Sequence, residues 1–241
     1  SYEPDGGWGE GPGYWHYATR YTGYALTALE TALGADFGLS DRAGLRKTGF
    51  FPLYMTAPTG LLFCFADVRS PAPRRNLPVL LYLARRYEEP TFAAAEHEII
   101  RERGARPQDY VWYVPVEGEP AELKLDKRFR GPADVVVMRS AWGDPEALFV
   151  GVKAGANGVN HSHLDLGAFV LDALGVRWAR ELGSDDYNLP GYWDSGAGGR
   201  RWSYYRLNSR SHNLPLLDGR NQRVDGVAKL VERLAQAVMR C

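Results

Sequence analysis

The periodicity of the apolar residues changes near residue 104, and this change constrains the fold more than any other feature of the sequence. Before it, a 3.6-residue period predicts helices over residues 14–33, 41–47, 77–87 and 91–103. After it, short β-branched and aromatic runs predict strands over residues 110–114, 134–139, 147–152, 167–171, 175–183 and 204–207. Helices followed by strands indicate an α+β chain, with a helical domain over residues 1–104 and an antiparallel β domain over 105–241.

Two segments fit this division less simply. Residues 50–65 are aromatic but contain Pro52, Pro58 and Gly60, so we expect an ordered loop that passes through a core. Residues 227–240 have the pattern of a helix, which fits poorly with a sheet that still needs strands.

Composition excludes several classes of protein. The 241 residues are 45% hydrophobic and 24% charged, as in ordinary globular proteins. The 29 basic and 29 acidic residues cancel, so no overall field favours nucleic acid or an anionic membrane. No apolar run reaches the ~18 residues of a membrane span. Cys64 and Cys241 imply no disulfide framework, and Cys64 is expected to be a buried apolar residue. Without a start methionine or a signal peptide, the sequence suggests a fragment of a longer protein.

Residues 160–167 read Asn-His-Ser-His-Leu-Asp-Leu-Gly and contain two of the five histidines. On an extended backbone, His161, His163 and Asp165 would face one side. A polar strand end with hydrogen-bonded histidines explains the same spacing.

A glycine-rich run, Asp-Gly-Gly-Trp-Gly-Glu-Gly-Pro-Gly, occupies residues 5–13. No apolar strand precedes it and no Gly-Lys-Ser/Thr follows it, which excludes a nucleotide-binding loop. The glycines would let a ligand approach closely. Tyr14, Tyr17, Tyr21 and Tyr24 then share one helix face, either as functional phenols or as a packing surface.

Together these motifs resemble the heparinase II/III-like polysaccharide lyases, a group that includes oligoalginate lyases. Residues 5–17 resemble the family's "DG…EG…Y" segment; residues 160–169, 181–187 and 211–213 resemble its β domain. The resemblance implies the C-terminal part of an (α/α) toroid followed by an incomplete antiparallel β-sandwich. It also implies a periplasmic or secreted enzyme that cleaves acidic, uronic-acid-containing polysaccharides by β-elimination.

The resemblance also implies functional residues. Tyr14, with Tyr17 as the alternative, would transfer protons, and His161 and Asn160 would stabilise the enediolate. Zinc, as a structural ion, would be held by His163, Glu181 and His212, with Glu181 where the family more often has Asp. The implied substrate-binding residues are Glu10, Trp15, Arg201 and Arg206, and a guanidinium suits carboxylate or sulfate.

The chemistry requires a group that neutralises the uronate carboxylate, a base for the C5 proton and an acid for the leaving oxygen at C4. A tyrosine with an ordinary pKa of ~10 is a natural acid, whereas a basic role requires a depressed pKa from a neighbouring cation such as His16.

Two rival classes of function stay open. A glycoside hydrolase would need two carboxylates, such as Glu10 with Asp67 or Asp185. A non-catalytic carbohydrate-binding or structural domain would make Tyr14 dispensable.

Overall fold

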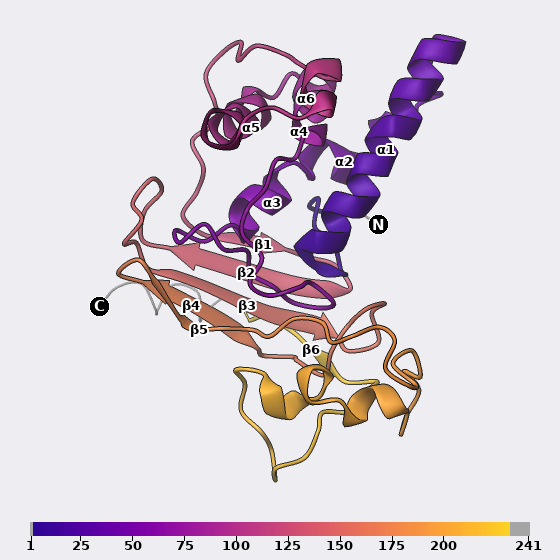
Figure 1. Ribbon diagram of the computed structural model, residues 1–241, viewed down its shortest axis with the longest axis vertical. Helices are drawn as coiled ribbons and strands as arrows, with labels where there is room; N and C mark the ends of the chain where they lie inside the picture. Colours follow the sequence, from indigo (N-terminus) through magenta and orange to yellow (C-terminus); the bar gives the residue numbers. More distant parts are fainter. Residues whose placement is uncertain (1, 232–241) are drawn as a thin grey trace.

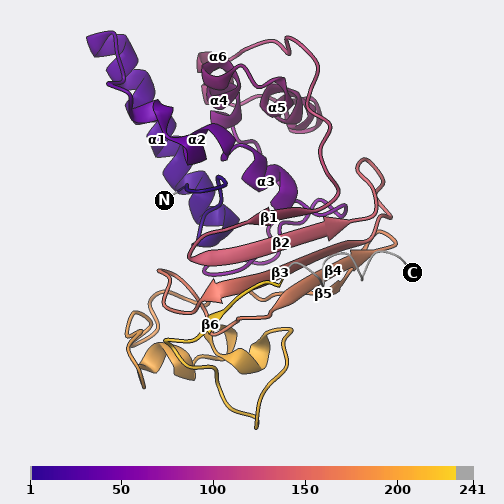
Figure 2. The same ribbon diagram turned by 180° about the vertical axis from the view of Figure 1, so that it is seen from behind.

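The computed structural model describes residues 2–231, and in it the helices lie on one side of a central sheet, with a lobe of turns on the other (Figures 1 and 2). The helices are α1 (Gly11–Leu33), α2 (Ala43–Lys47), α3 (Phe50–Met55), α4 (Val79–Tyr87), α5 (Pro90–Arg103) and α6 (Pro107–Val111). The strands are β1 (Lys127–Phe129), β2 (Ala133–Arg139), β3 (Phe149–Ala156), β4 (Phe169–Ala173), β5 (Val176–Ala179) and β6 (Val227–Ala228). Short 3-10 turns occupy Leu39–Asp41, Arg200–Ser203, Tyr205–Leu207 and Ser209–Ser211.

The strands form one open antiparallel sheet in the order β1-β2-β3-β4-β5, and β6 pairs with the end of β3. Val135 of β2 lies opposite Lys153 of β3, and Val137 opposite Gly151. Side chains alternate between the faces of a strand, so Val135, Val137 and Lys153 share the face toward the helices. All three are at most 1% exposed. Lys153 therefore carries its charge into the core.

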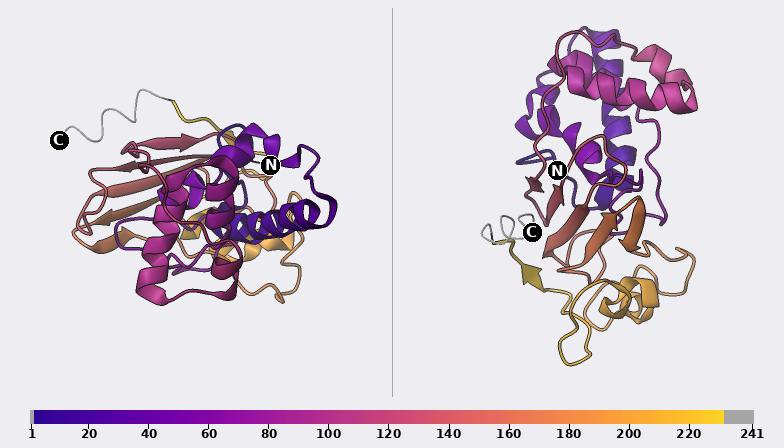
Figure 3. Two further views of the ribbon diagram at one scale, coloured as in Figure 1. Left: turned by 90° about the horizontal axis from the view of Figure 1, so that it is seen from above. Right: turned by 90° about the vertical axis from the view of Figure 1, so that its left-hand side faces the viewer.

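Aromatic rings join the helices to this sheet. Phe129 of β1 lies edge-to-face against Phe51 of α3, with ring centroids 5.1 Å apart, and Phe51 in turn contacts Trp15 of α1. Edge-to-face pairs stabilise a core beyond the burial of their area. These ring contacts place the first turn of α1 next to the sheet. The layers follow the order helices, sheet and turns (Figure 3).

The start of α1 depends on a glycine. Gly11 has φ +82°, and a Cβ there would lie 2.4 Å from the carbonyl oxygen of Phe65. Pro12 fills the first turn, where no intrahelical N–H bond is lost, and Gly34 ends the helix in the left-handed conformation. At Gly11, therefore, the glycine allows protein backbone rather than a ligand to approach.

Several sequence predictions are corrected. Residues 50–65 are not wholly loop, because Pro52 sits in the first turn of α3, where helices tolerate proline. Residues 110–114 do not form a strand, since Pro107 and Asp109 start and cap α6. Residues 204–207 include a 3-10 turn, and residues 227–228 form β6, while residues 232–240 of the expected helix lie outside the described residues.

The larger architecture is confirmed in its coarser form. Helices come first and an antiparallel sheet second, but the part of the chain that the structure describes shows neither a toroid nor a second sheet. Cys64 is buried as expected, and burial raises the pKa of its thiol to about 11. Among residues 2–231, no helix is long and apolar enough to cross a bilayer.

Glu96 of α5 should make stability pH-dependent. Its side chain is fully buried and accepts the backbone N–H of Leu77 at 2.8 Å. Burial, with the charge of Asp109, raises the pKa of Glu96 to about 8. The protonated form is favoured in the folded state, so this contribution is complete below the unfolded pKa of ~4.3 and is lost as pH rises toward 8. We expect the free energy of unfolding to fall by up to roughly 1.4 kcal/mol per pH unit across this window.

Urea unfolding of the wild type and of Glu96→Gln between pH 4.5 and 8 measures this slope. Gln keeps an acceptor for Leu77 but cannot ionise, so the variant should show a shallower slope. Equal slopes would exclude Glu96 as the cause.

Candidate functional site

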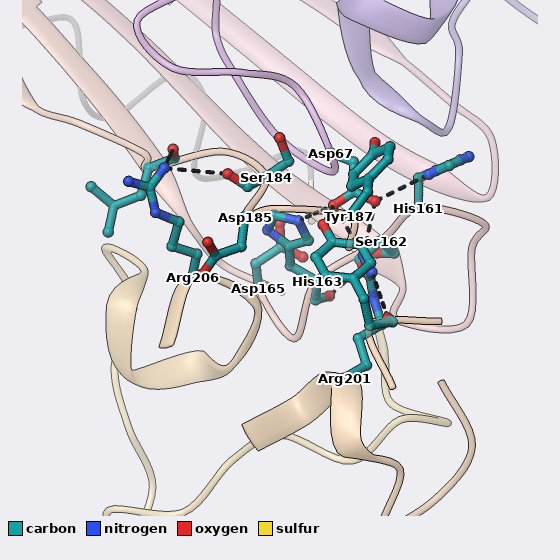
Figure 4. Close-up of polar contacts among 12 residues, drawn as sticks. Asp67, His161, Ser162, His163, Asp165, Ser184, Asp185, Tyr187, Arg201 and Arg206 are labelled. Atoms are coloured by element: carbon teal, nitrogen blue, oxygen red, sulfur yellow. Dashed lines mark hydrogen bonds and ion pairs between the residues drawn. The ribbon is translucent and has the colours of Figure 1, made fainter. Parts of the chain in front are cut away.

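The segment 158–168 is built from turns rather than from a strand. Its residues contact Asp67 in the loop after Phe65 (Figure 4) and Tyr14 near the start of α1. The extended conformation expected for residues 160–165 is wrong, because His161 has φ +58°. Ala66 has φ +57°, and the next N–H, from Asp67, donates to the carbonyl oxygen of His161 at 3.1 Å. Left-handed backbone at non-glycine residues costs ~1–3 kcal/mol each and gathers at functional sites.

The buried carboxylate of Asp67 is the central acceptor of the site. It accepts hydrogen bonds from Nδ1 of His161 at 3.1 Å and from Nε2 of His163 at 2.9 Å. The Tyr192 hydroxyl donates to it at 2.7 Å and the Arg201 guanidinium at 3.1 Å. Burial opposes ionisation, but the hydrogen bonds from the two histidines outweigh it and hold the pKa of Asp67 well below its usual range.

This carboxylate determines which ring nitrogens carry hydrogen. An ionised carboxylate only accepts, so Nδ1 of His161 and Nε2 of His163 must both donate. The lone pair of neutral His161 is then on Nε2, and that of His163 on Nδ1. The two imidazoles are fixed in opposite tautomers by one side chain.

Tyr14 lies on the cleft side of His161. The two rings stack with centroids 4.0 Å apart and an interplanar angle of 22°. The Tyr14 hydroxyl is 2.8 Å from that of Tyr187. Burial raises the pKa of Tyr14, and the hydrogen bond from Tyr187 offsets part of this rise. Burial, followed by the bond to Tyr14, raises the pKa of Tyr187 strongly, so Tyr187 stays a proton donor.

Tyr17 lies one turn further along α1. It is 56% exposed and packs on Tyr21. Both Tyr14 and Tyr17 line the cleft, but it is Tyr14 whose ring contacts His161.

The cleft beside these residues has a volume of about 820 Å³. Its walls come from the first turns of α1, the loop at residues 67–75 and the segment at residues 184–188. Gly183 permits the approach of that last segment, since a Cβ there would lie 1.9 Å from the carbonyl oxygen of Val68. The volume is enough for several sugar units of a polymer.

The predicted substrate-binding residues occupy different environments. Trp15 is fully buried and donates to Thr48 at 2.7 Å, so it has a packing role and no surface for a ligand. Arg201 is 3% exposed and serves Asp67 instead of a ligand. Arg206 lines the cleft but donates to the carbonyl oxygens of Leu182 and Ser184. Glu10 accepts the Asn160 amide at 2.9 Å, which positions Asn160 beside the start of α1.

A second cluster lies behind Asp67. Potential ligand atoms of His163, Asp165 and His212 lie within 4.8 Å of one another, and all three residues are buried. Oδ2 of Asp165 and Nε2 of His212 are buried without a hydrogen-bond partner among the described residues. Unpaired buried polar atoms of these types are what a cation would satisfy.

Glu181, the third expected ligand, lies one step further out. It is hydrogen-bonded to Nδ1 of His212, and it accepts the backbone N–H of Asn213 at 3.0 Å. Burial opposes protonation of His212, but the bond to Glu181 and the nearby carboxylates outweigh it and raise the pKa of His212. Of the predicted set, the structure brings His163 and His212 together, with Asp165 in the place expected for Glu181.

Lys153 of β3 supplies the positive charge that pairs with Asp165 in this cluster. Its ammonium group contacts Asp165 and donates to Ser162 at 3.0 Å with no exposed side-chain surface. Burial works against ionisation of Asp165, yet the charge of Lys153 lowers the pKa of Asp165.

Sequence reasoning missed Lys153 and Tyr187, and it considered Asp67 only for a hydrolase. The available signals were a single lysine in the apolar run Phe-Val-Gly-Val-Lys and a single aspartate directly after Phe-Cys-Phe-Ala. A lone charge inside an apolar run is costly to bury without a partner, so it marks a paired group.

No protein-family model matches this sequence, and no curated protein does. Solved structures do resemble it. A heparinase III has a TM-score of 0.67 at 21% identity, over 94% of this chain and 32% of that one. A heparan sulfate lyase HepC mutant from Pedobacter heparinus gives 0.63 at 18%, over 90% and 31%. A second heparinase III gives 0.58 at 15%, over 83% and 30%. The chain thus shares the fold of about a third of these lyases.

Proposed function

We propose that this chain is part of a polysaccharide lyase that cleaves uronic-acid-containing polysaccharides by β-elimination. The observation that carries the proposal is the stack of Tyr14 on His161, with Asp67 bonded behind the imidazole. An acid that lines an open cleft is thus in contact with an oriented imidazole. The lyases that share the fold support the choice of reaction and of an acidic polysaccharide as substrate.

Tyr14 acts as the acid that protonates the leaving oxygen at C4. Its raised pKa keeps the phenol protonated at neutral pH. His16, considered as a cation that could depress the pKa of a tyrosine, does not fill that role, because burial and neighbouring arginines lower its own pKa to about 4. The environment of Tyr14 therefore favours the acid role over the base role in the free protein.

His161 acts on the C5 proton. With Nδ1–H held by Asp67, the lone pair of Nε2 is available to accept that proton, and the carboxylate stabilises the imidazolium that forms. Asn160, fixed by Glu10, offers its second amide hydrogen to the substrate carboxylate. Such a donor stabilises the enediolate as charge develops on it.

Tyr187 supports Tyr14 after proton transfer. Once Tyr14 has given up its proton, the hydroxyl of Tyr187 donates to the phenolate at the 2.8 Å separation. The rings of Tyr192 and Trp193 pack against Tyr187, with centroids 5.0 and 4.8 Å away, and hold it in place.

The cluster of His163, Asp165 and His212 fits a zinc ion in chemistry, since it combines two imidazoles with a carboxylate. Glu181 would orient His212 through Nδ1, as carboxylates behind metal-bound histidines do. A zinc ion here would tie the 160–165 turns to the 211–213 segment as a structural cross-link. The expected periplasmic or secreted location remains a prediction.

The hydrolase alternative loses one of its two candidate pairs, Glu10 with Asp67, whereas Asp185 still lines the cleft. Asp67 is buried and bonded to four side chains, so it is not free to attack or protonate a sugar. A hydrolase that uses Asp185 and a non-catalytic carbohydrate-binding domain are the two rivals that the next experiment tests, because neither forms an unsaturated uronate.

Tyr14→Phe should lower turnover by ~10²–10⁴-fold in the full-length protein that contains this chain, because it removes the acid and keeps the ring. Tyr17→Phe is the matched control and should retain activity. Formation of unsaturated uronate, followed by ultraviolet absorbance over a panel of uronic-acid polysaccharides, measures both. If Tyr17→Phe alone is inactive, the acid lies one turn away; if both variants keep full activity, the domain does not use this mechanism.

Zinc content should depend more on Asp165 than on Glu181. We expect one zinc per chain in the wild type and its loss in His163→Ala and Asp165→Asn. Glu181→Gln should keep the metal with affinity lowered by ~10–100-fold, as for a residue that orients a ligand. Elemental analysis and competition with a chelator measure this. Full loss in Glu181→Gln with retention in Asp165→Asn would restore Glu181 as the ligand.

A further inference from the structure

Two neighbouring segments supply most of the charged residues that line the cleft. The loop at residues 67–75 contributes Arg69, Arg74 and Arg75 to the lining. The segment at residues 184–188 contributes Asp185 and Asp186, and it adjoins the loop through the backbone pairing of Gly183 with Arg69. A polyanion in this cleft is therefore attracted to the guanidinium groups of the 67–75 loop and repelled by the carboxylates of the adjoining segment.

The arginines of the cleft differ in what they already bind. Arg74 is paired with Glu98 at 3.4 Å, and Arg206 donates to two carbonyl oxygens. Arg69 and Arg75 are exposed, and their guanidinium groups have no hydrogen bond or ion pair within residues 2–231. These two cations are free to bind a ligand.

The lowered pKa of His16 reflects, in part, the positive charge at this end of the cleft. It lines the same cavity, and burial together with the charges of Arg20, Arg75 and Arg106 lowers its pKa. A neutral imidazole adds a hydrogen-bonding group without adding charge. The excess charge here thus comes from the guanidinium groups.

We propose that Arg69 and Arg75 form an anion-binding subsite that takes a sulfate or carboxylate group of a sugar flanking the cleaved bond. The identity of the polymer rests on the proposed function; the presence of the subsite rests on the two free guanidinium groups in the cleft that Tyr14 also lines. A guanidinium group binds either anion through two parallel N–H bonds. In this proposal Arg69 and Arg75 take the anion-binding role that was expected for Arg201 and Arg206.

Binding of size-defined acidic oligosaccharides to the full-length protein tests this subsite. The test variant is Arg69→Ala/Arg75→Ala. Its matched control is Arg85→Ala/Arg101→Ala, which removes two exposed arginines of α4 and α5 that do not line the cleft. We expect Kd to rise about tenfold or more in the test variant, as for the loss of charge-assisted bonds, and to change by less than about twofold in the control.

Three ligands separate the sources of the anion: a sulfated heparan oligosaccharide, the same oligosaccharide after desulfation, and an unsulfated oligouronate. If the test variant loses affinity only for the sulfated oligosaccharide, the subsite binds a sulfate group. If it loses affinity equally for all three ligands, the subsite binds a carboxylate group. Both results support the subsite. Unchanged binding in the test variant, an equal loss in the control, or no binding of any of these ligands by the wild type would overturn it.

This outcome is separable from that of the lyase assay. Tyr14→Phe should bind these ligands like the wild type, because the subsite does not use the phenol. If no unsaturated product forms on any uronate while the test variant still loses affinity, the proposed reaction fails and the subsite stands. Equal thermal midpoints of the wild type and the variants confirm that the exposed substitutions leave the fold intact.

Discussion

The candidate site depends on the hydrogen bonds that the buried carboxylate of Asp67 accepts. A buried charge is costly unless it is paired and hydrogen-bonded, and Asp67 meets both conditions through Arg201, Tyr192 and two histidines. The arrangement gives one acceptor two functions. It leaves Nε2 of His161 free for the proposed proton transfer, and it leaves Nδ1 of His163 free on the side of the buried cluster.

The backbone is shaped around the same contact. Ala66 and His161 both adopt left-handed conformations, and the N–H of Asp67 bonds the carbonyl oxygen of His161 between them. The aromatic contacts from Trp15 through Phe51 to Phe129 hold the first turn of α1 against the sheet. Tyr14 is therefore presented to His161 by the core, and the strain at two residues is held by packing elsewhere.

The sequence predicted the elements more successfully than the contacts. Long periodic segments such as α1 and α5 were recognisable, and Tyr14 and His161, two residues that the family resemblance implied for catalysis, are in contact. The short runs at residues 110–114 and 204–207 were misread because β-branched and aromatic residues also occur in turns that proline and capping contacts fix. Asp67 is separated from His161 by 94 residues, and Lys153 and Tyr187 likewise act through contacts set by the tertiary fold. No local pattern reports such pairs. The proposed metal ligands illustrate the limit: the family resemblance implied His163 and His212, but the carboxylate that converges with both imidazoles is that of Asp165, while Glu181 lies behind His212.

The tautomers of His161 and His163 test the central claim most directly. Nitrogen-15 NMR of the imidazoles distinguishes Nδ1–H from Nε2–H, and assignment by His161→Gln and His163→Gln identifies each ring. If Asp67 fixes both histidines, neutral His161 carries its hydrogen on Nδ1 and His163 on Nε2, and Asp67→Asn releases this preference. A wild type with His161 protonated at Nε2, or with the same tautomers after Asp67→Asn, would contradict the account.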